Sequence, residues 1–175
     1  ECRQMLSTGM SIEGPSAVRY PRGSGNGTTP GTDLSTLPVG KGEIRRNGEN
    51  IALLAFGSMV TPAMAAGETL NATVANMRFV KPIDRELISQ LAREHSLLVS
   101  VEENAVIGGA GAEVARVLEE ISRETGKYTS LLRLGLPDRF IDHGDHARLL
   151  SELGLDCDGI VRAVQERLAR TAANT

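Results

Sequence analysis

Two arginines close together in the chain have the clearest potential for chemistry. The stretch SAVRYPRG, residues 16–23, ends a short apolar run with Arg19 and Arg22. A guanidinium group is always charged, and its planar N–H donors match the oxygens of a phosphate or carboxylate two at a time. Side chains alternate along an extended strand, so Arg19 and Arg22 are expected to point to opposite faces. The stretch indicates either an anion-binding strand end or a charged, solvated edge.

A second polar segment, VEENAVIGGAGAEV, follows an apolar run further along the chain. Glu102 and Glu103 end the run, and Gly108, Gly109 and Gly111 precede a helical pattern. In an open parallel sheet, ligands bind at the carboxyl ends of strands, and a helix N-terminus attracts anions. One interpretation is therefore a phosphate cradle beside Glu102 or Glu103. The spacing lacks G-x-G-x-x-G, which favours the other interpretation: the glycines allow close packing, and Glu103 pairs or caps locally.

The serine and histidine patterns are less specific. Ser58, in FGSMV, follows a strand pattern and precedes a helix, but G-x-S-x-G is missing and His143 or His146 would have to act as the base. A helix-start serine is the favoured interpretation. HGDH spaces the two histidines by three residues, but a glycine lies between them and no nearby cysteine supplies a third ligand. We therefore expect solvated turn histidines and no metal site.

Composition excludes several classes of protein. The 175 residues are 41% hydrophobic, enough for a core, with a net charge of −3 and only 3% aromatic residues. Without a basic run, nucleic-acid binding is not indicated, and no apolar stretch approaches the roughly 18 residues that span a bilayer. Cys2 and Cys157 are too few for a disulfide framework, so free thiols in a reducing cytoplasm are expected. The first residues, ECRQML, read as a helix already under way, so we expect a piece of a longer protein.

The chain divides at a segment rich in glycine and proline. Residues 24–41 have the composition of a linker. Residues 1–23 would then hold the last helix and strand of an upstream α/β domain, and residues 42–175 would form a second domain.

The second domain shows alternating strand and helix patterns. Strands are predicted at 50–57, 72–80, 96–104 and 127–137, with helices between them and two more helices at the end of the chain. Three helices are expected to start at residues that favour helix N-termini: Thr61 with Pro62, Asp84, and Asp156 or Asp158. An additional strand before residue 47 is expected to form a hairpin turned at Asn47–Gly48. The pattern predicts an α/β fold with a mostly parallel, doubly wound sheet.

Six segments, taken together and in order, carry a resemblance that covers essentially the whole chain. They are ECRQML, GPSAVRYPRG, LPVGKGEI, NMRFVKPID, VSVEENAVIGGAGAEV and LGLPDRFIDHG. This set closely resembles the C-terminal portion of transketolase-like, thiamine-diphosphate-dependent synthases. The resemblance implies that residues 1–23 end the pyrimidine-binding domain, that 24–41 are the linker, and that 42–175 form the transketolase C-terminal-like domain.

The resemblance also implies a reaction. Pyruvate would condense with glyceraldehyde 3-phosphate and release CO2, giving 1-deoxy-D-xylulose 5-phosphate for isoprenoid, thiamine and pyridoxal biosynthesis. Thiamine diphosphate and Mg2+ would be bound by residues outside this chain, because the family's cofactor motifs are missing here. Arg22 would contact the phosphate of the acceptor, whereas Arg19, the second candidate, would form a structural ion pair. No catalytic residue, cofactor contact or metal ligand is assigned in this chain.

The partners follow from the same resemblance. They are the N-terminal domains of the same protein and, in a homodimer, a second copy, with neither nucleic acid nor membrane involved. The chain alone is expected to be inactive, because charge stabilisation needs the missing cofactor site. Two alternatives remain open: a β-subunit-type domain of a thiamine-dependent 2-oxoacid dehydrogenase, and a non-catalytic α/β interaction module that binds a nucleotide at GGAG.

Overall fold

Five strands form one sheet, in the order β1-β3-β2-β4-β5. The computed structural model describes residues 1–21, 27, 29 and 31–173. The strands are β1 (Glu43–Arg46), β2 (Ile51–Ala55), β3 (Thr73–Asn76), β4 (Leu97–Ala105) and β5 (Ser130–Leu136). β2 pairs in parallel with β3 and β4, β4 pairs in parallel with β5, and only β1 runs antiparallel to its neighbour β3. The predicted α/β class with a mostly parallel sheet is confirmed.

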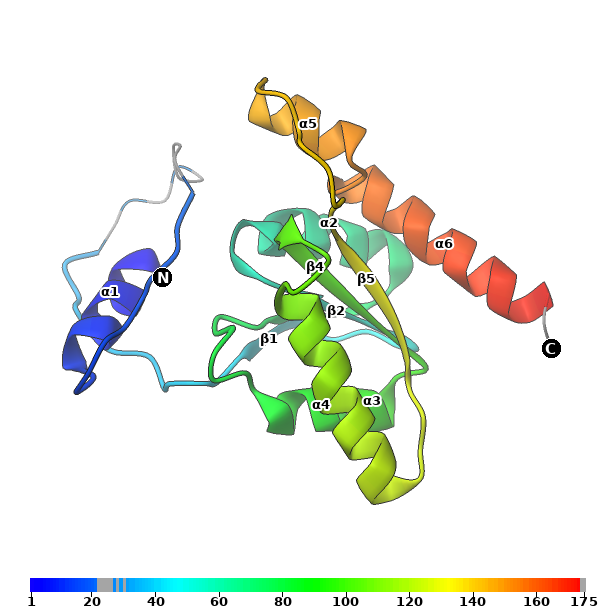
Figure 1. Cartoon of the computed structure of the whole chain (residues 1–175), viewed down its shortest axis with the longest axis horizontal. Coiled ribbons are helices and arrows are strands. Elements are labelled where there is room, and N and C mark those ends of the chain that lie inside the picture. The colour runs from blue at the N-terminus through cyan, green and yellow to red at the C-terminus, as the bar shows by residue number, and fades with distance from the viewer. Residues whose placement is uncertain (22–26, 28, 30, 174–175) are drawn as a thin grey trace.

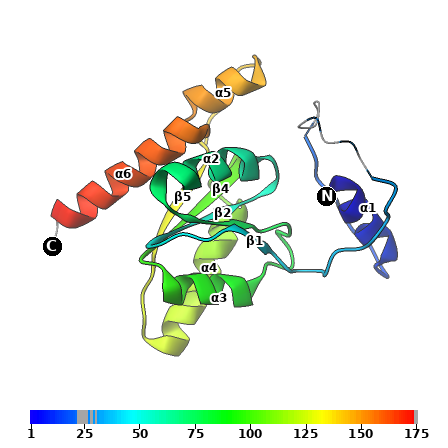
Figure 2. The ribbon, with the colours of Figure 1, turned by 180° about the vertical axis from the view of Figure 1, so that it is seen from behind.

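Helices cover both faces of this sheet, as a doubly wound fold requires. The helices are α1 (Cys2–Ser11), α2 (Val60–Leu70), α3 (Arg85–Glu94), α4 (Ala110–Thr125), α5 (His146–Glu152) and α6 (Cys157–Ala173), and a short 3-10 helix, η1 (Gly57–Met59), leads into α2. Figures 1 and 2 show α2 and α6 on one face and α3 and α4 on the other. Within the described part of the chain, no helix combines the length and apolar character needed to cross a membrane.

Alternating side chains of the central strands feed two separate cores. Leu53 and Val99 pack with Ile160 of α6 on one face, whereas Leu54 and Leu98 pack against α3 and α4 on the other. All five residues of β2 are buried. Each fully buried leucine contributes on the order of 2 kcal/mol to the stability of the fold. β2 and β4 are therefore the best-packed strands, and the candidate site lies where they end.

Two of the three predicted helix starts are confirmed. The Asp84 carboxylate accepts the Leu87 N–H at 3.0 Å and starts α3. Asp156, rather than Asp158, caps α6 by accepting the Gly159 N–H at 2.8 Å. α2 begins slightly earlier than predicted, at Val60, which leaves the predicted Thr61 and Pro62 in its first turn.

The predicted hairpin is wrong. β1 pairs with β3 rather than with β2, although the Asn47–Gly48 sequence suggested a tight turn between β1 and β2. β2 is buried on both faces and takes a parallel neighbour at each edge, so β1 pairs with the outer edge of β3 instead. The Gly48 N–H donates to Thr73 Oγ1 at 2.9 Å, which fixes the connection against the start of β3.

Two further strand predictions need correction. The strand predicted at 72–80 ends at Asn76, because the Asn76 side chain accepts the N–H of Arg78 at 3.2 Å and Arg78 turns with φ 56°. Residues 15–21 form no strand, so the predicted strand at the end of residues 1–23 is not found in its described part. A strand needs a neighbouring edge to pair with, and this segment meets the sheet through a side chain instead.

The helix α1 lies apart from the sheet, on the side opposite to α6 (Figures 1 and 2). Part of the segment that follows it folds back along it: the Leu37 N–H donates to Thr8 Oγ1 at 2.8 Å, and Gln4 Nε2 donates to the Ser35 hydroxyl at 3.0 Å. The Glu1 carboxylate accepts from Asn76 Nδ2 at 2.9 and 3.0 Å. These contacts connect α1 to the carboxyl end of β3.

Candidate functional site at the carboxyl edge of the sheet

The carboxyl ends of β2 and β4 form the topological switch point of the sheet. The chain leaves β2 for α2 and then β3, whereas it leaves β4 for α4 and then β5, on the other side. Open parallel sheets bind ligands in the crevice at such a point. Ser58 follows β2 here, and Glu102 and Glu103 lie near the end of β4. Ser58, Glu102 and Glu103, which the sequence analysis singled out, therefore lie close together at this edge of the sheet.

Glu102 occupies the N-terminus of α4. Its side chain is buried, and its two carboxylate oxygens accept the N–H groups of Ala110 at 2.6 Å and Gly111 at 2.7 Å. A negative charge at this end of a helix is stabilised by the unpaired N–H groups and the helix dipole. A side chain at Gly109 would place its Cβ 2.3 Å from Glu102 Oε2. The glycines thus make room for the protein's own carboxylate, which supports the packing interpretation over the phosphate cradle and moves the capping role from Glu103 to Glu102.

A bulge in β4 directs the two neighbouring glutamates to different partners. Val101 pairs with Leu134 and Ala105 with Leu136, so three residues of β4, 102–104, lie opposite Gly135 alone. A Cβ on Gly135 would lie 2.7 Å from the Asn104 carbonyl oxygen. Bulges interrupt the ladder and re-aim side chains, and they are frequent beside functional sites.

Glu103 accepts hydrogen bonds from three residues in distant parts of the chain. Its Oε2 accepts the Ser58 hydroxyl at 2.7 Å, its Oε1 accepts Nε2–H of His146 at 2.6 Å, and its main-chain oxygen accepts Arg19 Nη2 at 2.9 Å. We call these four residues the Glu103 network. It joins the segment after α1, the turn after β2, the bulge of β4 and the start of α5.

The network sets the ionisation of Glu103. Burial alone raises the pKa of this carboxyl, but hydrogen bonds from His146 and Ser58, with the positive charge of Arg19 nearby, outweigh burial and hold the pKa below its ordinary value. A lowered pKa in the folded state stabilises the fold at pH values above the ordinary pKa. That contribution is lost as the pH falls through the folded-state value.

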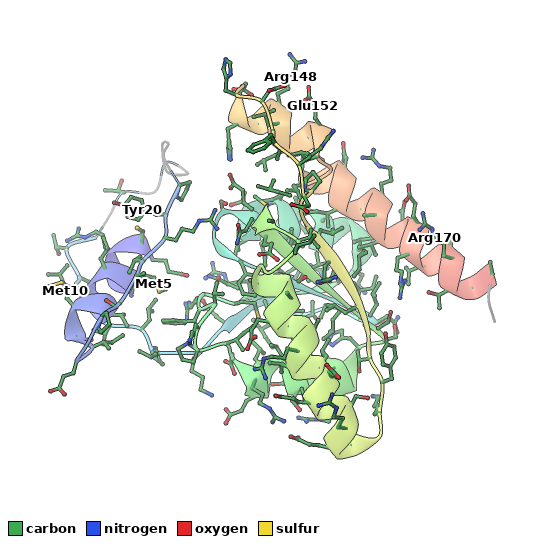
Figure 3. All side chains as sticks on the ribbon, in the orientation of Figure 1. Met5, Met10, Tyr20, Arg148, Glu152 and Arg170 are labelled. Atoms are coloured by element: carbon green, nitrogen blue, oxygen red, sulfur yellow. The ribbon has the colours of Figure 1, made fainter. Side chains whose placement is uncertain are left out.

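We therefore expect the Glu103 carboxyl to titrate below its ordinary pKa, measured by the 13C shift of its carboxyl carbon. The His146→Ala variant should raise this pKa, because it removes the strongest lowering contact. Arg148→Ala, on the same helix, should leave it unchanged, because Arg148 pairs with Glu152 instead; Figure 3 labels both. An unchanged pKa in His146→Ala would show that the contact is not formed in solution.

The positions of the other candidates differ from the sequence analysis in part. Arg22 lies outside the described residues. Arg19 bonds to a carbonyl oxygen, where an ion pair was expected, although the Glu103 carboxylate lies close enough for its pKa to be lowered by Arg19. The Ser58 hydroxyl donates to the Glu103 carboxylate rather than to a histidine, and the lowered pKa of that carboxylate makes it a poor base for activating Ser58 as a nucleophile.

His146 is exposed, as predicted, but it is the first residue of α5 rather than a turn residue, and its ring contacts Glu103. No local sequence signal could have found this pair, because the two residues are 43 positions apart. His143 is exposed, and the two cysteines are free thiols. Over the described part of the chain, no three His, Cys, Asp or Glu side chains are grouped so that they could hold a metal ion.

The fold and the arrangement at the carboxyl edge of the sheet agree with a match to a known protein family. The family model for the transketolase C-terminal domain matches residues 40–160. That match covers more than half of the chain, and the chain therefore belongs to the transketolase C-terminal domain family.

Individual curated proteins are more closely similar to this chain than the family as a whole. The chain is 68% identical over 167 residues to the 1-deoxy-D-xylulose-5-phosphate synthase of Dechloromonas aromatica, covering 95% of this chain and 26% of the relative. It is 59% identical over 165 residues to the synthase of the same name from Azoarcus sp., again covering 26% of that protein. The chain thus spans about a quarter of the length of these relatives.

A solved structure has the same fold. It is described as a split gene transketolase, an inactive beta4 tetramer, and matches with a TM-score of 0.69 at 33% identity, over 77% of this chain and 44% of that one.

The two positions in the described residues where thiamine diphosphate or Mg2+ was tested do not fit these groups. The glycine-rich N-terminus of α4, which the sequence analysis raised as a phosphate cradle, is filled by Glu102. The grouped carboxylates that hold Mg2+ in proteins are likewise not found among the described residues.

Proposed function

We propose that this chain is the C-terminal quarter of a synthase that condenses pyruvate with glyceraldehyde 3-phosphate and releases CO2, giving 1-deoxy-D-xylulose 5-phosphate. The observation that carries the proposal is the 68% identity to a synthase of that name over 95% of the chain. Thiamine diphosphate, which supplies the carbon–carbon bond chemistry when bound, and Mg2+ belong to other parts of the protein. The proposed protein is a cytoplasmic homodimer that supplies isoprenoid, thiamine and pyridoxal biosynthesis.

The proposed contribution of this chain is to recognise the acceptor. In this proposal residues 1–23 end the pyrimidine-binding domain, 24–41 link the domains, and 42–175 form the C-terminal domain. Arg22 binds the phosphate of glyceraldehyde 3-phosphate, because a guanidinium group offers paired donors to phosphate oxygens. The contact between Arg19 and the end of β4 supports this role, since it brings the arginine-bearing segment to the ligand-binding edge of the sheet.

The test is the Arg22→Ala variant of the full-length protein, assayed with glyceraldehyde 3-phosphate and with D-glyceraldehyde, which has no phosphate. We expect kcat/KM for the phosphorylated acceptor to fall by roughly 10- to 100-fold, because hydrogen bonds to charged groups contribute about 1.5–3 kcal/mol. The value for D-glyceraldehyde should change little. Arg22→Lys, which keeps the charge but loses the planar fork, should lie between the two.

Arg45→Ala is the matched control, because Arg45 is an exposed arginine on β1 that pairs with Glu43. The 175-residue chain by itself should be inactive in the same assay. An equal loss for both acceptors in Arg22→Ala would contradict phosphate recognition by this residue, and a full-length protein that makes no 1-deoxy-D-xylulose 5-phosphate would contradict the proposed reaction.

The two alternatives have less support. Eight curated relatives carry the synthase name, at 53–68% identity, which disfavours a 2-oxoacid dehydrogenase subunit. The Glu102 carboxylate lies where a nucleotide phosphate would bind in an interaction module. Calorimetry with ATP would test the module, for which micromolar binding is expected.

A further inference from the structure

We propose that Arg19 is a positioning residue: its hydrogen bond to Glu103, whose side chain is held by Ser58 and His146, keeps the segment after α1 on the carboxyl edge of the sheet in the geometry that acceptor-phosphate recognition needs. This inference rests on the proposed function. It assigns a role to Arg19, Glu103, Ser58 and His146, none of which touches the phosphate in the proposal.

The first support is that the anchor point is held from two sides. Glu103 receives Ser58 at 2.7 Å from the turn after β2 and His146 at 2.6 Å from the start of α5. Both contacts are charge-assisted, and such hydrogen bonds are stronger and more directional than neutral ones. The oxygen that accepts Arg19 therefore belongs to a residue whose side chain is already fixed.

The second support is the interruption of the β4–β5 ladder at this residue. Glu103 lies within the three bulged residues that face Gly135 alone. In a regular ladder a main-chain oxygen is used by the neighbouring strand, but here the Glu103 oxygen accepts Arg19 Nη2 at 2.9 Å. The bulge thus presents an acceptor to a segment that lies 84 residues earlier in the chain.

The third support is the stiffness of the segment itself. Pro21 has a fixed φ and restricts the residue before it, Tyr20, to extended conformations. Figure 3 shows Tyr20 on the segment that follows α1. A chain advances at most about 3.5 Å per residue, so an anchor at Arg19 also restricts the positions of Tyr20 and Pro21.

α1 has its own attachment to the sheet, which does not depend on Arg19. Glu1, at the other end of this N-terminal part, bonds to Asn76 at 2.9 and 3.0 Å. α1 is therefore attached to the sheet without Arg19, and loss of the Arg19 contact should release the segment and leave α1 in place.

The test uses the full-length protein with Arg19→Ala, Arg19→Lys and His146→Ala, assayed with both acceptors. We expect Arg19→Ala to raise KM for glyceraldehyde 3-phosphate about fivefold, the change that loss of one ordinary hydrogen bond produces. The KM values for pyruvate and D-glyceraldehyde and the kcat should stay within about twofold. Arg19→Lys, which can still donate to the carbonyl, should recover part of the loss, and Arg45→Ala is again the control.

A double-mutant cycle tests whether the effect runs through the network. If Arg19 acts through Glu103, the two substitutions should not act independently. The double variant His146→Ala/Arg19→Ala should then raise KM for glyceraldehyde 3-phosphate by less than the product of the two single fold-changes. Purely multiplicative effects, or an Arg19→Ala variant that weakens pyruvate and both acceptors alike, would overturn the positioning role.

The Arg22→Ala variant keeps this test distinct from the test of the proposed function. If Arg22→Ala lowers the preference for the phosphorylated acceptor and Arg19→Ala does not, the positioning role is wrong while the proposed phosphate site stands. If Arg22→Ala does not lower that preference, the proposed phosphate site fails and the positioning role fails with it.

Discussion

Replacing Glu102 with alanine is expected to destabilise the domain by about 3 kcal/mol, because two hydrogen bonds to a charged acceptor are lost and a buried helix end is left unpaired. The carboxylate is 3% exposed, so little water can reach the N–H groups of Ala110 and Gly111 in its place. Urea unfolding followed by circular dichroism would measure the loss as a lower transition midpoint. Glu102→Gln keeps one acceptor oxygen and should lose about half as much.

Glu120→Ala is the matched control for this prediction. Glu120 lies on the same helix and pairs with Arg116 at the surface, where an ion pair contributes about 0.5 kcal/mol. If Glu102→Ala unfolded at the same urea concentration as Glu120→Ala, the carboxylate would not be the cap of α4.

Gly109→Ala is expected to have a similar effect, about 3 kcal/mol, at the upper end of what overpacking causes. The added Cβ would lie 2.3 Å from both the Ala105 carbonyl oxygen and Glu102 Oε2. One of these is main chain and the other is held by α4, so neither can move without losing contacts. The measurement is again the free energy of unfolding in urea.

Gly144→Ala provides the comparison, because it adds the same methyl group at the same edge of the sheet. Its Cβ would meet Leu149 side-chain atoms at 3.5 Å, an ordinary contact distance. We expect a change within about 0.5 kcal/mol, the usual range for surface positions. Equal effects of Gly109→Ala and Gly144→Ala would contradict the close packing at Gly109.

The sequence predicted the elements whose signals are local. The strand predicted at 50–57 and the Asp84 cap each depend on a few neighbouring residues, and both are found. The hairpin at Asn47–Gly48 failed because strand pairing is decided by residues far away: β3 takes the place beside β2 that the turn signal had assigned to β1.

The site could be predicted only in pieces. The arginine pair and the two glutamates stood out by residue type, yet nothing in the spacing showed that Arg19 meets Glu103 across 84 positions. His146 was missed for the same reason, since only the return of the chain after β5 brings it to β4. The exchange of roles between Glu102 and Glu103 depends on the bulge, which a strand pattern read two residues at a time does not reveal.

The carboxylate at the start of α4 has a consequence for how this fold can diversify. With that position taken by the protein's own anion, a change of substrate does not require rebuilding the strands, whose geometry can be inherited intact. If the proposed function holds, selectivity would instead change through a few amino acids in the segment that follows α1.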